Sequence, residues 1–174
     1  YTGEVSPRQL KSSHVSHVII GHSERRTHFQ EDDLLISKKV VAVLKEKMTP
    51  IVCIGETIEE KEMGKTPLVF KNQLLIALKD VSPEEIKDVI IAYEPVWSIG
   101  SGRTPSFDEI EDTVTYIKDI VMKNYNSEIK VLYGGSVDKK NIKSIINIKN
   151  VDGLLIGSAS LEWQYFLEML NVIE

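Results

Sequence analysis

The feature that most constrains the fold of this chain is a unit that occurs five times, made of a short β-branched strand, a glycine-rich or polar turn and an amphipathic helix. Each expected strand is apolar almost throughout and is followed by helical periodicity, a pattern typical of parallel strands covered on both faces. The five expected strands are His17–Gly21, Pro50–Gly55, Val89–Tyr93, Lys130–Tyr133 and Gly153–Ile156. The repeat therefore predicts a parallel α/β protein.

Five βα units permit two architectures. One is a doubly wound five-stranded sheet that is complete at 174 residues, and the other is the larger part of an eight-unit barrel, which typically takes about 250 residues. No linker or low-complexity tract divides the sequence, so residues 1–174 are expected to form a single domain. In both architectures, ligands bind beyond the carboxyl ends of the strands.

Charge, apolar runs and cysteine usage exclude several classes of protein. A net charge of −5 argues against broad nucleic-acid binding, which needs a positive face. Apolar runs such as Val18–Ile20 and Val89–Ala92 are far shorter than the roughly 20 residues of a membrane-spanning helix. Cys53 is the single cysteine, so no internal disulfide is expected. We interpret Cys53 as a packed core thiol and expect a reducing, cytoplasmic setting.

The turns after the strands hold most of the polar chemistry. His22 follows the first expected strand and Glu94 the third, and such residues suit an electrophile and a base. Glycine and serine turns at Gly134–Ser136 and Gly157–Ser160 each open a helix, where backbone N–H groups can bind an anion. These turns together predict proton transfer on a phosphorylated substrate.

Signatures of metal and dinucleotide sites are incomplete in this sequence. His22-Ser23-Glu24 matches half of the zinc deaminase signature, but the required Pro-Cys-x-x-Cys is missing. Gly100-Ser101-Gly102 never supplies the third glycine of a dinucleotide fingerprint. We therefore expect no metal and no cofactor.

Six sequence blocks, in order along the whole chain, resemble the triosephosphate isomerase family. They are Tyr1–Glu4, Val18–Arg26 with Gly-His-Ser-Glu-Arg-Arg, Cys53–Glu56, Ala92–Gly102 with Tyr-Glu-Pro-Val-Trp, Leu132–Val137 with Tyr-Gly-Gly-Ser, and Asp152–Gly157. The resemblance implies a (β/α)8 TIM barrel, of which this chain represents about the last five βα units. Tyr1 would then lie in the loop after the third strand.

The resemblance also implies an activity and its residues. The reaction is the interconversion of dihydroxyacetone phosphate and D-glyceraldehyde 3-phosphate through an enediolate, a step of glycolysis and gluconeogenesis. Glu94 corresponds to the base and His22 to the electrophile, and Glu24 to a residue held near the catalytic lysine. Ser23 is the expected N-cap of the following helix, so the imidazole of His22 would meet the positive helix end and remain neutral.

Substrate binding and assembly follow from the same resemblance. Pro95–Arg103 corresponds to a lid that closes over the substrate. Thr2-Gly3-Glu4 corresponds to the loop that makes the family's homodimer, and Arg25 to the arginine that reaches the neighbouring subunit. The backbone N–H groups expected to bind the substrate phosphate are those of Gly100, Ser136, Gly157 and Ser158.

Three departures from the family pattern bear on activity. No Asn-x-Lys strand precedes His22, so we expect the 174-residue chain by itself to lack the lysine that balances the substrate's charge. Arg103-Thr104-Pro105 stands where the family usually has Lys-Thr-Ala, and Ser158 replaces a glycine, which is tolerable if its φ is negative. The alternative hypothesis is an inactive truncated barrel or a phosphate-binding α/β module.

Overall fold

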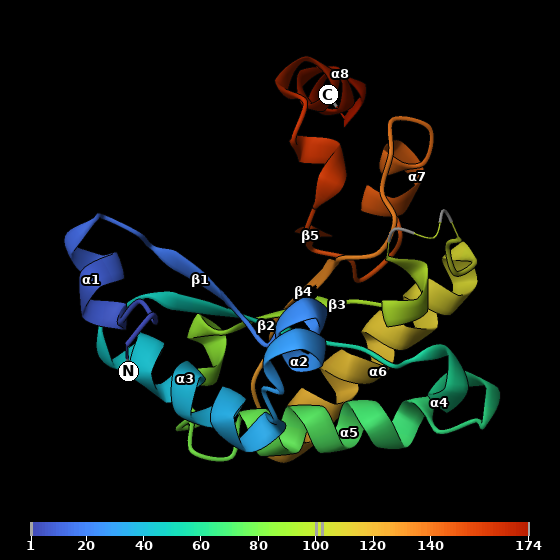
Figure 1. The fold of residues 1–174 in the computed structure, drawn as a ribbon. Helices are drawn as coiled ribbons and strands as arrows, with labels where there is room; N and C mark the ends of the chain where they lie inside the picture. Colours follow the sequence, from blue (N-terminus) through green and yellow to red (C-terminus); the bar gives the residue numbers. More distant parts are fainter. Residues whose placement is uncertain (1, 100, 102, 174) are drawn as a thin grey trace.

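Five parallel strands form one sheet in which each strand pairs with the next along the chain (Figure 1). The computed structural model describes residues 2–99, 101 and 103–173. Its strands are β1 (His17–Ile20), β2 (Thr49–Ile54), β3 (Ile90–Tyr93), β4 (Lys130–Tyr133) and β5 (Gly153–Leu154). A doubly wound sheet reverses its strand order at a switch point. The order β1-β2-β3-β4-β5 has no reversal, so the doubly wound alternative is wrong, and the order is consistent with consecutive units of a barrel.

Three strands end earlier than the sequence predicts, and β2 does so by one residue, at Ile54 instead of Gly55. β1 stops at Ile20 because Gly21 takes a φ of +71°, which turns the chain out of the strand. β5 ends at Leu154, two residues before the expected end at Ile156. The last strand therefore contributes only two residues to the sheet.

The helices follow the strands in the expected alternation. They are α1 (Pro7–Ser12), α2 (Ser23–Phe29), α3 (Asp33–Lys45), α4 (Ile58–Glu62), α5 (Thr66–Ala77), α6 (Phe107–Tyr125), α7 (Ile142–Ile146) and α8 (Trp163–Ile173), with short 3-10 turns η1 (Ile86–Asp88), η2 (Val96–Ser98) and η3 (Ser158–Ser160). The Ser106 side chain caps α6, and Glu109 completes a capping box. The spacing of Ser106 and Glu109 in the sequence predicts this capping box, and the structure confirms it.

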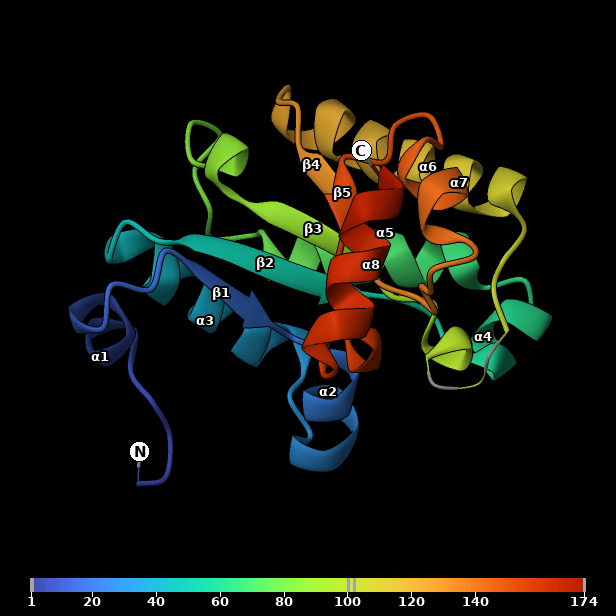
Figure 2. The same cartoon turned by 90° about the horizontal axis from the view of Figure 1, so that it is seen from above.

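Helices α3, α5 and α6 cover one face of the sheet (Figures 1 and 2). Val52, Ile91 and Val131 lie in register on neighbouring strands and are completely buried. Since neighbours in register point to the same face, these side chains form the strand side of the core. Tyr93 extends this layer, with edge-to-face contacts at 5.4 Å to the ring of Phe70 and at 6.0 Å to that of Tyr133.

The opposite face of the sheet is less well covered. Ile19, Ile51 and Ile90 lie in register across β1, β2 and β3; Ile19 is 50% exposed and the other two are half-buried. The prediction that the strands are covered on both faces is therefore wrong for β1. Within the described residues, β1 and β5 each pair with a single neighbour, so the sheet is open.

The C-terminal elements lie apart from the main core. Helix α8 stands on the side of the sheet opposite α3, α5 and α6, and it packs against α7 and η3 (Figures 1 and 2). Met169 is the single buried side chain within Trp163–Ile173. Trp163, Leu167 and Leu170, spaced at i, i+4 and i+7, are exposed along one stripe. No helix within the described ranges is long and apolar enough to cross a membrane.

Candidate active site

Glu94 directly follows β3 and packs closely against Gly55, the residue that follows β2. The Glu94 backbone N–H donates to the Ile54 carbonyl at 2.8 Å. A Cβ on Gly55 would lie 1.6 Å from the Glu94 carbonyl oxygen, so only glycine permits this approach. The Glu94 side chain is 3% exposed. The local backbone thus holds a carboxylate in an almost fully buried position at the carboxyl end of the sheet.

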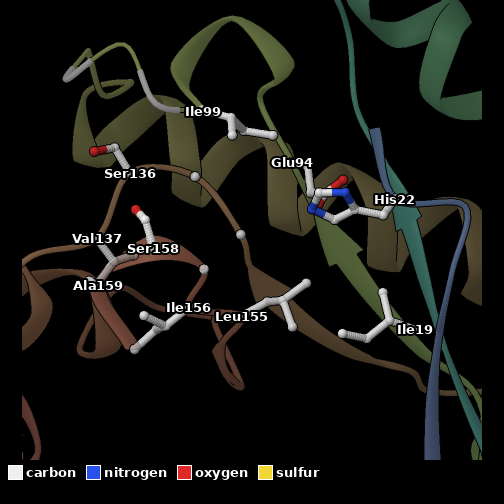
Figure 3. Close-up of a pocket in the computed structure, with 13 residues that line it drawn as sticks. Ile19, His22, Glu94, Ile99, Ser136, Val137, Leu155, Ile156, Ser158 and Ala159 are labelled. Carbon is white, nitrogen blue, oxygen red and sulfur yellow. The ribbon is translucent and has the colours of Figure 1, made fainter. Parts of the chain in front are cut away.

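His22 and Glu94 meet although 71 residues separate them along the chain (Figure 3). The His22 Nε2 lies 3.0 Å from the Glu94 Oε1, and the second carboxylate oxygen accepts the Ser23 backbone N–H at 3.2 Å. β1 and β3 carry these residues to the same edge because parallel strands end together. The structure therefore brings together the two residues predicted as base and electrophile.

The hydrogen bonds of His22 define where its ring proton lies. His22 itself is the N-cap of α2, since its Nδ1 accepts the Glu24 backbone N–H at 3.3 Å. The prediction that Ser23 is the N-cap is wrong; Ser23 is the first helical residue, because His22 keeps an extended backbone with ψ of 144°. With Nδ1 as acceptor, a neutral imidazole carries its proton on Nε2 and donates it to Glu94.

Burial raises the pKa of Glu94 above its usual range, and the neighbouring His22 and the Ser23 N–H oppose part of that rise. A carboxylate with a raised pKa is a stronger base once it is ionised. Cys53 lies beside Glu94, completely buried and free, and burial also raises the pKa of its thiol. The interpretation of Cys53 as a packed core thiol agrees with this burial.

Glu24 occupies the first turn of α2 with an exposed side chain. Its backbone N–H positions the imidazole of His22, but its carboxylate has no hydrogen bond or ion pair to His22 or Glu94. The structure therefore brings the Glu24 backbone, and not its carboxylate, into the site.

A cavity of about 200 Å³ opens beside the histidine–glutamate pair (Figure 3). Ser136 borders it after β4, and Gly157 and Ser158 border it after β5. Its volume is smaller than the roughly 300–1,000 Å³ of pockets for drug-sized ligands, which favours a small ligand. Ser158 has no positive φ, so serine fits where the family pattern has glycine. Gly100, the fourth predicted phosphate-binding residue, lies outside the described residues.

The segment expected to be the lid is anchored at its start by residues to which the sequence assigned no role. The Trp97 indole N–H donates to Glu56 at 2.8 Å, and the Lys61 ammonium lies 4.1 Å above the Trp97 ring. Burial raises the pKa of Glu56. The only sequence signal for Glu56 is its place in the Cys-Ile-Gly-Glu block after β2.

Ser98 is a second residue that sequence reasoning missed. Its hydroxyl donates to the Arg103 carbonyl at 2.6 Å and accepts the Ser136 backbone N–H at 3.3 Å. These bonds join both ends of the expected lid to the turn after β4. Ser98 lies inside the Ala92–Gly102 block, but residue types do not reveal these contacts, since both partners are backbone atoms.

Arg25 pairs within the chain. Its guanidinium contacts Glu31 at 2.6 Å and Glu4 at 3.4 Å, and lies 4.3 Å above the ring of Phe29. Thr2, Gly3 and Glu4 are exposed. The predicted dimer contacts of these residues stay predictions. No cluster of three or more metal-ligating side chains occurs in the ranges 2–99, 101 and 103–173.

Comparison with known proteins adds independent information. The family model described as triosephosphate isomerase matches residues 1–173. The chain is 44% identical over 175 residues to a triosephosphate isomerase of Alkaliphilus oremlandii, with 98% of this chain and 71% of that protein covered. It is 46% identical over 174 residues to a triosephosphate isomerase of Mycoplasmoides gallisepticum, with 98% and 69% covered. With the contact of His22 to the buried Glu94 at the strand ends, these matches show that the chain belongs to the triosephosphate isomerase family.

Proposed function

We propose that this chain is a triosephosphate isomerase that interconverts dihydroxyacetone phosphate and D-glyceraldehyde 3-phosphate through an enediolate. The observation that supports this function best is the contact of 3.0 Å between His22 and the buried Glu94 at the edge of a small cavity. The relatives named triosephosphate isomerase supply the reaction class. Triosephosphate isomerase is itself the standard example of a glutamate base acting with a neutral histidine.

Glu94 is the proposed base. Its carboxylate removes a proton from the carbon next to the substrate carbonyl and returns that proton to the neighbouring carbon, which converts ketose into aldose. The raised pKa of Glu94 brings its basicity closer to what carbon deprotonation needs. Ser23 holds the other carboxylate oxygen through its backbone N–H, so the base keeps its orientation while it exchanges the proton.

His22 is the proposed electrophile. Its Nε2 proton, which points at Glu94 in the free protein, would donate instead to the substrate carbonyl oxygen, where negative charge develops. The substrate would thus enter between the two side chains. The Glu24 N–H keeps Nδ1 as an acceptor, which fixes the ring proton on Nε2. For the Glu24 carboxylate we propose a contact with the family's catalytic lysine.

The phosphate group is proposed to bind at the far wall of the cavity. Ser136, Gly157 and Ser158 would donate backbone N–H groups, together with Gly100 of the lid. Ser158 begins η3 directly after Gly157, so the amides at this turn belong to the first turn of a short helix. Closure of Pro95–Arg103 would exclude water and protect the enediolate from losing phosphate. The Trp97 indole bonded to Glu56 fixes the start of that segment.

We further propose that the open sheet is the last five units of an eight-unit barrel. The unreversed strand order, the exposed Ile19 on the poorly covered face and the exposed stripe of α8 support this proposal. The upstream units would bring the Asn-x-Lys strand. A homodimer through Thr2-Gly3-Glu4 and Arg25, and a cytoplasmic location, belong to the same proposal; the family is typically dimeric.

Replacement of the base tests the function directly. We expect Glu94→Gln to lower the isomerisation rate by about 10²- to 10⁴-fold, the usual contribution of a general base. Glu85→Gln is the control, since the Glu85 carboxylate bonds Ser82 and belongs to the segment before β3, away from the cavity. A loss below about tenfold in Glu94→Gln would show that the base is assigned wrongly.

A further inference from the structure

The hydroxyl of Ser98 accepts a hydrogen bond from the backbone N–H of Ser136, one of the groups expected to bind phosphate. Ser98 is completely buried at the end of η2. Its oxygen accepts the Ser136 N–H at 3.3 Å, while its proton goes to the Arg103 carbonyl at 2.6 Å. The Ser136 N–H therefore points at a buried hydroxyl and not into the cavity that Ser136 borders. A ligand that needs this amide must compete with the Ser98 oxygen.

Another polar side-chain group beside Ser98 is the hydroxyl of Tyr133. The Tyr133 hydroxyl lies near Ser98, is completely buried and has no hydrogen-bond partner of normal geometry within the described ranges. A Cβ on Gly135 would lie 2.2 Å from that hydroxyl, so the turn packs directly on the Tyr133 ring.

We propose that Ser98 is a positioning residue that holds the Ser136 amide in the ligand-free protein and releases it to the substrate phosphate. This inference rests on the proposed function, because it requires a phosphate group at the turn after β4. The Ser98 hydroxyl acts as a stand-in acceptor that keeps the amide satisfied between turnovers. Its consequence is that substrate binding exchanges one hydrogen bond for another and gains less affinity than an unoccupied amide would give.

This exchange of hydrogen bonds predicts that removing the Ser98 hydroxyl strengthens phosphate binding, whereas most substitutions in a binding site weaken it. Ser98→Ala removes the side-chain acceptor of the Ser136 N–H, so the cost of the lost hydrogen bond falls on the free protein and not on the phosphate complex. We expect this variant to bind inorganic phosphate about 3- to 10-fold more tightly than the parent protein. The KM for triose phosphate should fall with it, and kcat should change less, since Glu94 and His22 are untouched.

A matched control separates this effect from loss of a buried hydroxyl. Ser37 is also completely buried, and its hydroxyl donates to Asp80 at 3.3 Å on the helix-covered side of the sheet. Ser37→Ala should lose stability much as Ser98→Ala does, but its affinity for phosphate should stay at the parent value. Ser98→Cys keeps a weak acceptor, so its affinity for phosphate should lie between those of the parent and Ser98→Ala. The cysteine variant replaces the alanine variant in the test if the latter does not fold.

The test is calorimetric titration of parent and variants with inorganic phosphate, together with hydrogen exchange of the Ser136 amide. Support requires tighter binding by Ser98→Ala and faster Ser136 exchange in its phosphate-free form, with protection returning when phosphate binds. If the parent binds phosphate and Ser98→Ala binds it no more tightly than Ser37→Ala, the inference is wrong while the proposed function stands. If the parent binds no phosphate, the inference and the proposed phosphate site are both wrong.

Discussion

The two halves of the site are built on parts of the molecule that differ in packing. The proposed proton-transfer pair follows β1 and β3, behind which α3, α5 and α6 form a buried core. The turn at Gly157 and Ser158 stands between a strand of two residues and α8, where Met169 is the one buried residue of the helix. The proposed proton-transfer groups thus lie on the better-packed part, and the proposed phosphate donors at Gly157 and Ser158 lie on the weaker part.

Two glycine substitutions give the largest expected contrast between the two regions. In Gly55→Ala the new Cβ would meet the Glu94 carbonyl oxygen at 1.6 Å, so β2 and β3 must separate. We expect a loss of more than about 3 kcal/mol in the free energy of unfolding, along with loss of isomerase activity. In Gly157→Ala the Cβ meets nothing within 4 Å, and we expect a change within about 0.5 kcal/mol. Urea denaturation of both variants provides the measurement, and similar losses would abolish the contrast.

A core truncation tests the packing of the stronger half. Ile91 on β3 is completely buried against the helix layer. Ile91→Ala should lower the free energy of unfolding by about 2–5 kcal/mol, from lost burial and the cavity left behind. Thermal denaturation followed by circular dichroism measures it. A loss below about 1 kcal/mol would mean that β3 is not the centre of the core.

The pH dependence of activity examines the burial of the base. Glu94 acts in its ionised form, so kcat/KM should fall as the pH falls through the Glu94 pKa. Because burial raises that pKa, the acidic limb of the profile should lie above the ordinary glutamate value of about 4.3. A profile of kcat/KM against pH at constant ionic strength is the measurement. An acidic limb at or below the ordinary value would show that the free enzyme does not bury this carboxylate.

The smallest change in stability is expected for a substitution on the exposed face of α8. Leu167 is 49% exposed, so Leu167→Ala should change the stability of this 174-residue chain by no more than about 0.5 kcal/mol. The same substitution should cost more when the remaining barrel units are supplied, because α8 would then pack against them. Equal effects in both settings would argue that the α8 stripe faces no further unit.

Much of the fold was predictable because its signals are local. Strand β4 has the predicted bounds, and Ser106 caps α6 as expected. For α3 the apolar spacing in the sequence predicts a stripe of Leu34, Leu35, Val40, Val41 and Leu44. Val40 is buried, but Ile36 and Val43 are buried as well, and Leu34 is 52% exposed. The phase of that helix is set by its packing on β1 and β2, which apolar spacing alone does not encode.

The candidate site was predictable to the level of its motifs. His22 and Glu94 could be paired because parallel strands bring their ends together. The cap by His22 in place of Ser23 depends on the backbone turn at Gly21, whose positive φ has no signature beyond glycine itself. The bonds of Ser98 to Arg103 and Ser136 involve backbone atoms, and residue type does not specify such partners.

The central claim is that Glu94 moves the proton and does not merely help to bind substrate. Deuterium incorporation from D2O into triose phosphate, followed by NMR, tests it alongside phosphate titration of the same samples. The account predicts that Glu94→Gln binds inorganic phosphate as the parent protein does but incorporates deuterium more than about 100-fold more slowly. Incorporation within about tenfold of the parent rate, with phosphate binding intact, would contradict it.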